Sequence, residues 1–501
     1  MRSQLRVRDP LSCISVVSPK SESENDRRTR LLAAAAITLG RLSDVLTPLG
    51  EMFAARGHEL YLVGGSVRDA VLGRLGTDLD FTTDARPEQV LEIVRGWADN
   101  IWDTGGLAFG TVSAAKSGWQ LEITTFRSDT YDRVSRNPEV SFGDTLAGDL
   151  VRRDFTANAM AVRIGGLGEL EFVDPLDGMS ALLDGVLDTP AAPEDSFSDD
   201  PLRMLRGARF VAQLGFRLAP RVRAAIVEMA GEIERITAER VHAELDKLIG
   251  GQYPTEGIDV MCETGLAARV LPEVPAMQLE IDEHHQHKDV YQHSLTVLRQ
   301  AIDQEEGDPD LVLRWAALLH DIGKPPTKRN EPGGGVSFHH HEVVGAKMVR
   351  KRMRALKYSK QFTEDVARLV YLHLRFHGYG KGQWTDSAVR RYVTDAGDLL
   401  PRLHKLVRAD CTTRNKRRAA QLQSTYDDLE IRIARIQEQE DLARVRPDLD
   451  GNAIMELLGL PPGPEVGRAW RYLKELRLDR GPMDRDEAEA ALRQWWEQGA
   501  P

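Results

Sequence analysis

The segment from Tyr61 to Phe81, YLVGGSVRDAVLGRLGTDLDF, constrains the fold of this chain more than any other part of the sequence. Its pattern predicts a strand, a Gly-Gly-Ser turn, a short helix and a second strand that carries Asp78, Leu79 and Asp80. Residues i and i+2 of a strand face the same side, so the two carboxylates share one face while Leu79 points into the core. Such a pair suits Mg²⁺, which binds a few carboxylates together with waters and substrate phosphates. We therefore expect a divalent-metal site in a domain that mixes helices and strands.

The turn between the first strand and the helix suits an anionic ligand. Gly64 and Gly65 allow close approach of the backbone, and Ser66 opens a helix whose N-terminal N–H groups favour a triphosphate. Taken alone, an Asp-x-Asp pattern is more often a loop or a helix cap, and a Gly-Gly turn before a helix is common. Their combination within one strand, turn, helix and strand favours a site for a nucleotide and its metal.

Length and charge limit the number of domains and the kind of surface that this chain can have. With 501 residues it exceeds the size at which one hydrophobic core keeps growing, so roughly two to four domains are expected. The formal net charge of −11 argues against a uniformly basic surface. Basic clusters at Lys347–Lys360 and Arg414–Arg418 either hold phosphates or are solvated helix faces.

The sequence shows no sign of a membrane or a secreted protein. Apolar runs such as Leu32–Leu39 fall far short of the roughly 20 residues that span a bilayer. The N-terminus has no continuous apolar stretch of the kind found in a secretory signal. The 3 cysteines are widely separated and are interpreted as free thiols. We expect no membrane partner and a cytoplasmic location.

The patterning divides the chain into five parts. Residues 1–35 are polar and aperiodic and are predicted to be a disordered extension, while 36–183 predict an α/β or α+β head. Helical spacing then predicts a neck over 184–275, a His-rich body over 276–420 and a helical tail over 421–501. Besides the strand at Asp78–Asp80, the strand-like runs of the head are Leu60–Val63, Gly110–Ser113, Leu121–Phe126 and Glu171–Val173.

GGSVRD followed by DLD resembles the first motif of the polymerase-β-like superfamily, in the branch of bacterial CCA-adding enzymes and poly(A) polymerases. Two further motifs follow in order. Arg152–Met160 (RRDFTANAM) resembles a motif whose Arg and Asp contact the phosphates and ribose of the nucleotide, and Asp174–Gly178 resembles the DPxxG motif that joins head to neck. The resemblance implies catalytic, Mg²⁺-binding roles for Asp78 and Asp80. The nucleotide-binding residues that it implies are Gly64, Gly65, Ser66, Arg68, Arg153, Asp154, Asp200, Arg203 and Arg206.

Two features lie beside these motifs. Glu122, on a strand that leads into the segment between the first two motifs, is a candidate third acidic group. Thr125–Pro138 matches the mobile segment of the family, although it departs from the usual basic-rich form near Val134 and Ser135.

Without a template, protein side chains must read the incoming base. Asp199–Arg203 (DDPLR) resembles the EDxxR motif of the family, and on a helix Asp200 and Arg203 would share a face. One acceptor carboxylate and one donor guanidinium accept C and A, which present an amino group beside a ring nitrogen, and reject U and G. Helix capping by Asp200, with Pro201 in the first turn, is an alternative interpretation.

Glu239–Lys247 resembles the ERxxxEL motif and is assigned to holding the neck helices through pairs within one helix.

Of the 13 histidines, eleven lie between His284 and His404. LLHDIGKP, at Leu318–Pro325, with a histidine upstream and an aspartate downstream, resembles the HD phosphohydrolase superfamily. Imidazoles and carboxylates from separate helices can hold one or two divalent transition ions, whose bound water attacks a phosphoester. A lone histidine on a helix is more often structural. The resemblance implies a first metal site at His293, His320, Asp321 and Asp410, and a possible second one at His341 and His373.

Together these motifs imply template-independent addition of CCA to the 3′ end of tRNA from CTP and ATP, with the tail helping to bind the tRNA. Poly(A) polymerase and an enzyme that adds only A are alternatives within the class. A metal-dependent HD phosphohydrolase and a non-catalytic tRNA-binding protein are alternatives from other classes. The oligomeric state stays open.

Overall fold

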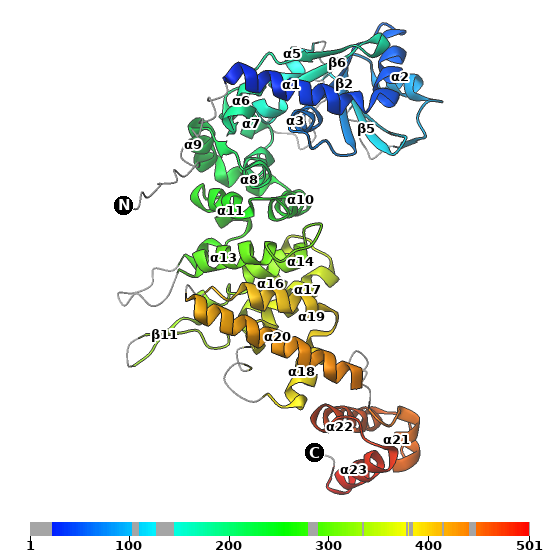
Figure 1. Ribbon diagram of the computed structural model, residues 1–501, viewed down its shortest axis with the longest axis vertical. Coiled ribbons are helices and arrows are strands. Elements are labelled where there is room, and N and C mark those ends of the chain that lie inside the picture. The colour runs from blue at the N-terminus through cyan, green and yellow to red at the C-terminus, as the bar shows by residue number, and fades with distance from the viewer. Residues whose placement is uncertain are drawn as a thin grey trace, which may run out of the picture. The chain divides into compact units, whose positions relative to one another are not determined.

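The computed structural model describes residues 23–102, 110–126, 145–278, 289–332, 335–376, 379, 384–412, 415–439 and 447–499. The chain forms two compact units. The first unit comprises Met1–Asp200 and Phe216–Ala225, and the second comprises Pro201–Gly215 and Ile226–Pro501. A mixed sheet lies in the first unit and the second is helical, which confirms the predicted fold class (Figure 1).

The first unit is built on a seven-stranded sheet of order β3-β4-β5-β2-β1-β6-β7. Within it, β2 and β5 run parallel, and all other neighbours are antiparallel. The strands are β1 (Leu60–Val63), β2 (Asp78–Thr83), β3 (Asn100–Trp102), β4 (Thr111–Lys116), β5 (Trp119–Thr125), β6 (Ala161–Ile164) and β7 (Leu170–Val173). Strands were expected at β1, β2, β4, β5 and β7, whereas β3 and β6 were not predicted. Both are short, with three and four residues.

Helices pack around this sheet, and the first of them corrects a prediction. The helices are α1 (Glu24–Gly40), α2 (Ser43–Ala54), α3 (Gly65–Val71), α4 (Pro87–Val94), α5 (Leu146–Val151), α6 (Gly178–Asp184) and α7 (Pro193–Asp199). The predicted disorder is wrong for residues 24–35, because α1 begins at Glu24 with the Ser23 hydroxyl accepting from the Asp26 N–H. Ala35 and Leu39 are buried in the core of the unit. Packing of this apolar side orders a segment whose average composition is polar.

The start of α6 is held by the DPxxG motif. The Asp174 carboxylate accepts from the N–H groups of Gly178 and Met179, at 2.7 and 2.9 Å. A Cβ at Gly178 would lie 2.4 Å from the Thr156 carbonyl oxygen, so only glycine fits there. This close approach holds α6 against the 3₁₀ turn Thr156–Asn158.

The second unit is helical over most of its described length, as the green to red ribbon in Figure 1 shows. Its helices include α8 (Leu202–Leu214), α10 (Ala238–Ile249), α11 (Pro254–Glu263), α12 (Leu266–Val270), α13 (Val290–Ile302), α14 (Leu311–Leu319), α15 (Lys324–Thr327), α16 (His341–Ala355), α17 (Lys360–Leu372), α18 (Asp386–Ala396), α19 (Leu400–Ala409), α20 (Lys416–Gln439), α21 (Gly451–Leu458), α22 (Pro464–Arg480) and α23 (Arg485–Glu497). Helix α9 (Pro220–Met229) belongs partly to each unit.

Short strand pairs interrupt this pattern, and the sequence did not predict them. In the first unit β8 (Val186–Leu187) pairs with β9 (Arg217–Leu218), and in the second β10 (Arg329–Asn330) pairs with β11 (Val336–Ser337). Over the described residues, no single helix is long and apolar enough for a membrane crossing. By length and composition alone, α1 and α2 reach that threshold only as a pair bent by 86°.

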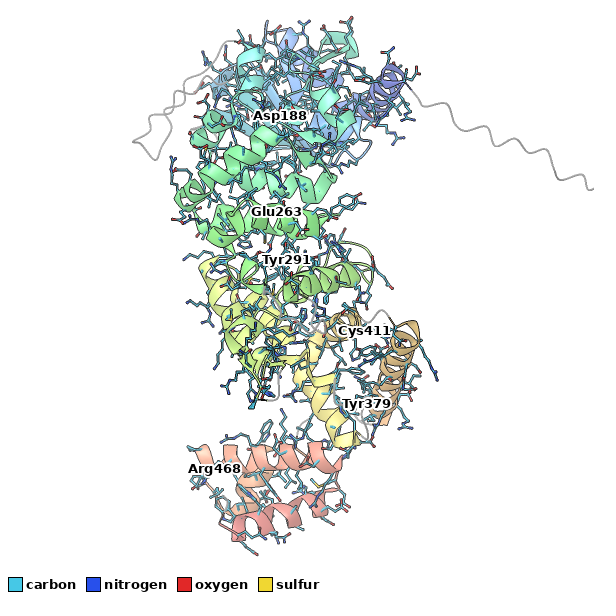
Figure 2. All side chains as sticks on the ribbon, turned by 90° about the vertical axis from the view of Figure 1, so that its left-hand side faces the viewer. Asp188, Glu263, Tyr291, Tyr379, Cys411 and Arg468 are labelled. Atoms are coloured by element: carbon cyan, nitrogen blue, oxygen red, sulfur yellow. The ribbon has the colours of Figure 1, made fainter. Side chains whose placement is uncertain are left out.

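Buried polar side chains join the helices of the second unit. Asp246 of α10 accepts from Trp315 Nε1 at 3.0 Å and from the Tyr358 hydroxyl at 2.5 Å. The hydroxyl of Tyr291, a residue labelled in Figure 2, donates to Asp259 of α11 at 2.6 Å. Burial, more than any other cause, raises the pKa of Tyr291. These bonds link α10 and α11 to the body helices.

Arg314 on α14 forms five hydrogen bonds of this kind. Its guanidinium forms hydrogen bonds of 2.6 to 3.1 Å with Glu305, and Nη1 donates to the carbonyls of Ile249 and Gly251 at 2.9 and 2.7 Å. The side chains of Arg314 and Glu305 are 6% and 7% exposed. The pair is therefore buried, and it also satisfies carbonyls at the end of α10.

Arg314→Ala should destabilise the protein by about 3–5 kcal/mol, because it leaves Glu305 buried and unpaired. Arg402→Ala removes the more exposed ion pair with Asp310 and should cost about 1 kcal/mol or less. Denaturant unfolding followed by circular dichroism measures both free energies. Equal losses in the two variants would contradict the role assigned to the buried pair.

Candidate functional site

Three carboxylates lie side by side on the central strands of the first unit. Leu79 is 1% exposed and points into the core, so Asp78 and Asp80 share the opposite face of β2, as predicted. The parallel register pairs Asp80 with Glu122 of β5. Partial desolvation, with the charges of Asp80 and then Asp78 added to it, raises the pKa of Glu122. This crowding of negative charge is what a divalent cation would relieve, so the donor set fits Mg²⁺.

Ser66 fixes the start of α3 to the carboxylate strand. Its buried hydroxyl accepts from the Asp80 N–H at 2.9 Å and donates to the Asp78 carbonyl at 3.3 Å. The side chain is thus engaged with the backbone of β2, so its part in the site is to hold the turn beside Asp78 and Asp80.

The absence of a side chain at Gly64 lets Arg153, from the RRDFTANAM motif, approach the same turn. Its φ of +68° is in the region that favours glycine, and a Cβ there would lie 2.7 Å from Arg153 Nη1 and 3.9 Å from Asp80 Oδ2. Arg153 also pairs with Asp149 at 3.1 Å. Its buried Nε has no hydrogen-bond partner among the residues that the structure describes. The guanidinium therefore lies over the turn and close to the metal-type carboxylates, where a phosphate would be held.

Arg68 and Asp154 are linked by a residue that the sequence analysis missed. Arg68 binds Asp69 through Nε at 3.0 Å and Nη2 at 2.7 Å, and its Nη1 donates to Asn158 Oδ1 at 2.6 Å. The Asn158 amide in turn donates to Asp154 Oδ1 at 2.9 Å. The only sequence signal for Asn158 was its place inside the RRDFTANAM motif.

The geometry predicted for Asp200 is wrong. Asp200 has an extended backbone, with φ of −141° and ψ of 98°, and α8 begins after it at Leu202. It therefore does not share a helix with Arg203, and the face-sharing argument does not apply. An extended residue before a helix is instead compatible with the capping interpretation. The predicted mobile segment falls largely within residues 127–144, outside the described part of the chain.

Glu244 of the ERxxxEL motif forms ion pairs between two helices. Buried Glu244 of α10 lies 3.2 Å from Arg209 and 4.0 Å from Arg206, both on α8. These pairs join α10 to α8. Arg209, which the sequence analysis did not single out, lies one turn after Arg206 and is 6% exposed.

The second unit gathers the predicted HD residues into two groups that share Asp321. His293, His320 and Asp321 form the first group, and Asp321, His341 and His373 form the second. Asp321 Oδ2 lies 3.1 Å from His320 Nε2, while its Oδ1 lies 3.2 Å from His341 Nε2 and 3.9 Å from His373 Nε2. The fourth predicted ligand of the first site, Asp410, lies 2.9 Å from His293.

Backbone carbonyls orient three of the imidazoles. The Nδ1 atoms of His320, His341 and His373 lie 2.9, 2.8 and 2.6 Å from carbonyl oxygens three residues earlier in the chain. A carbonyl only accepts, so each Nδ1 carries a proton, and whenever the ring is neutral its Nε2 is a lone-pair donor.

The buried ends of two of these rings fit metal ligation. Nε2 of His341 and of His373 are buried without a hydrogen-bond partner in the described residues. Burial, reinforced by nearby His320, lowers the pKa of His373 to about 3, so its ring is neutral. Lys324 places its ammonium 2.6 Å from Asp321 Oδ2. The two groups provide imidazole and carboxylate donors of the kind that would hold divalent transition ions.

The sequence matches three family profiles that follow these two sites. They are described as "Poly A polymerase head domain" over residues 60–188, "Probable RNA and SrmB- binding site of polymerase A" over residues 215–277, and "HD domain" over residues 290–415. The first profile contains the three carboxylates, and the third contains both histidine groups.

Relatives and a solved structure extend the similarity over most of the chain. An A-adding tRNA nucleotidyltransferase from Deinococcus radiodurans is 34% identical over 451 residues, which cover 87% of this chain and 95% of that one. A CCA-adding enzyme from Anoxybacillus flavithermus is 38% identical over 232 residues, which cover 46% of this chain and 56% of the relative. The crystal structure of a Bacillus stearothermophilus CCA-adding enzyme in complex with CTP matches with a TM-score of 0.66 and 25% identity, covering 91% of this chain and 98% of that one.

In metal-free buffer Glu122→Gln should become more stable than wild type as the pH rises. The folded pKa of Glu122 is raised above its ordinary value of 4.5, so the wild type loses stability as pH rises through that range while the variant does not. Thermal unfolding in EDTA between about pH 4.5 and about pH 7.5 measures the difference. A difference that does not change with pH would show that the pKa of Glu122 is not raised in the folded protein. Mg²⁺ should stabilise wild type and the exposed α4 control Glu88→Gln alike, and the Glu122→Gln variant less.

Proposed function

The chain belongs to the family of tRNA nucleotidyltransferases and poly(A) polymerases with a C-terminal HD domain, and from this we propose that it adds C, C and A to the 3′ end of tRNA. The substrates would be CTP and ATP, with pyrophosphate released at each step. The observation that supports this most is the meeting of the first two motifs around Gly64, where Arg153 and Asp80 approach the same turn. That arrangement provides negative groups for a metal and a positive group for phosphate.

The reaction is an in-line displacement. The terminal ribose hydroxyl of the RNA attacks the α-phosphate of the nucleotide, a new oxygen–phosphorus bond forms, and the bond to the β-phosphate breaks. Asp78, Asp80 and Glu122 would hold Mg²⁺, which stabilises charge on the attacking and leaving oxygens. Arg153 would bind the phosphates, and the Ser66 bonds keep the Gly-Gly turn beside β2. Catalysis is mostly positioning and charge stabilisation.

Base reading by Asp200 and Arg203 stays a prediction from their side-chain chemistry. A carboxylate accepts from the amino group of C or A, and a guanidinium donates to the adjacent ring nitrogen. Arg206 lies on the same helix as Arg203, and its approach to Glu244 limits its freedom. The ion pairs of Glu244 thereby support the helix that carries both arginines.

Addition of A alone is the first alternative, because the Deinococcus relative that matches 87% of this chain is named an A-adding enzyme. Both activities need the same metal carboxylates and phosphate contacts, so the site in the first unit does not separate them. The products made on defined tRNA ends do.

Incubation with Mg²⁺, four NTPs and tRNA that lacks CCA should yield C, C and A and then a stop, read by sequencing the 3′ ends. Asp78→Ala combined with Asp80→Ala should lower the rate by about 10³-fold or more, since a bound ion supplies several kcal/mol of charge stabilisation. Asp99→Ala, at a surface ion pair of the same unit, is the matched control and should keep the activity. Addition of A only to CC-ended tRNA would replace the proposal with the A-adding alternative. Unlimited addition of A would instead indicate a poly(A) polymerase.

A second function, phosphoester hydrolysis at the HD groups, is favoured by the two buried Nε2 atoms aimed at Asp321. His293, His320, His341, His373 and the aspartates Asp321 and Asp410 would hold divalent transition ions. Such ions supply a water that is acidic enough to attack phosphorus at neutral pH. This activity would be independent of the carboxylates on β2.

Asp321→Ala should abolish binding of both ions, because its two oxygens face both histidine groups. After dialysis against Mn²⁺, we expect about two ions per wild-type chain by elemental analysis, and hydrolysis of a generic phosphodiester reduced about 100-fold or more in the variant. His404→Ala removes a histidine that pairs with Glu430 outside both groups and is the control. Full metal content in Asp321→Ala would contradict the assignment.

A further inference from the structure

We propose that Asn158 is a positioning residue for sugar recognition, which orients the Asp154 carboxylate so that the enzyme selects ribonucleotides over deoxyribonucleotides. The inference rests on the proposed function and on the resemblance of RRDFTANAM to a motif whose Asp, here Asp154, contacts the ribose of the nucleotide. Asn158 acts through Asp154, and it joins that residue to Arg68 of the Gly-Gly turn and helix.

The chemistry of its partners fixes the orientation of the Asn158 amide. Arg68 can only donate, so the amide oxygen faces it, at 2.6 Å from Nη1. The ionised Asp154 carboxylate can only accept, so the amide nitrogen faces that side, at 2.9 Å from Oδ1. If the amide were flipped, its nitrogen would face the donor Arg68 and its oxygen would face the acceptor Asp154. The residue therefore has one orientation, and it transmits the position of Arg68 to Asp154.

The Oδ1 atom of Asp154 is held by this bond together with a second one. Its Oδ1 also accepts from the Phe155 N–H at 2.9 Å. Asn158 and Asp154 are 5% and 7% exposed, so both bonds lie away from bulk water, where they are stronger than at the surface. A carboxylate in a fixed plane discriminates a sugar hydroxyl better than one that rotates, because a substrate without the hydroxyl leaves the acceptor unpaired.

Contacts other than the Asn158 side chain also hold the turn that carries Asn158. The Thr156 N–H and hydroxyl lie 2.8 and 3.2 Å from the carbonyl oxygen of Asp188, which is labelled in Figure 2. The close approach of Gly178 to the Thr156 carbonyl holds the same turn from α6. Truncating Asn158 should therefore leave the backbone in place and free the carboxylate, which separates positioning from folding.

Steady-state addition to a tRNA that lacks CCA tests the proposal, with the ratio of kcat/KM for CTP to that for 2′-deoxy-CTP as the readout. Asn158→Ala should lower this ratio about tenfold, the effect of roughly one hydrogen bond. Asn158→Asp keeps the shape and the acceptor for Arg68 but cannot donate to Asp154, and it should lower the ratio as much. Thr156→Val removes a hydrogen bond from the same turn and should leave the ratio at its wild-type value.

The outcomes separate the inference from its premise. If wild type adds no nucleotide to tRNA, the proposed function fails, and this inference fails with it. If wild type is active and Asp154→Ala lowers the ratio but neither Asn158 variant does, Asn158 is only structural and the proposal is overturned. An equal fall of kcat/KM for both nucleotides in the Asn158 variants overturns it as well. Should Asn158→Ala fail to fold, as judged by thermal unfolding, the ratio measured for Asn158→Asp decides.

Discussion

The parallel pairing of β2 with β5 places three carboxylates where their charges repel one another, and the rest of the first unit is arranged around that constraint. The register sets Glu122 opposite Asp80, while Leu79 and Phe81 anchor the strand in the core. Burial first, and then the charges of Asp80 and Asp78, raise the pKa of Glu122. Like-charged groups held together by a folded sheet form a binding site for a cation, because the sheet has already met the cost of bringing them together.

Buried polar bonds keep this arrangement rigid. The Ser66 hydroxyl fixes the Gly-Gly turn to β2, and the absence of a side chain at Gly64 lets Arg153 come close to Asp80. On the other side of the turn, Arg68 and Asn158 carry the same geometry to Asp154. The second unit follows a similar rule, since carbonyl groups orient its histidines toward Asp321. In both units, bonds that never touch a ligand decide where the binding atoms lie.

Sequence patterns were reliable where the local signal was strong and failed where packing decided. The alternation of Asp78, Leu79 and Asp80 needed only the period of a strand, and the structure confirms it. Helix α1 was missed because its apolar side is ordered by contact with the core and not by its polar average composition. The helical geometry expected for Asp200 failed because α7 ends just before it and α8 starts after Pro201, a break that period counting does not detect.

The sequence by itself determined the mixed first unit, the helical second unit, the family, and the residue types of both candidate sites, because motifs and periodicity are local properties of the chain. Only the tertiary structure decided that Glu122 lies beside Asp80, that Gly64 meets Arg153, and that one aspartate serves two histidine groups. It also revealed that Asn158 lies between Arg68 and Asp154. Arg68 and Asn158, which share a hydrogen bond, are 90 positions apart in the sequence. Such contacts depend on strand register and close approach between distant segments, which follow from how the whole core packs and not from any one segment.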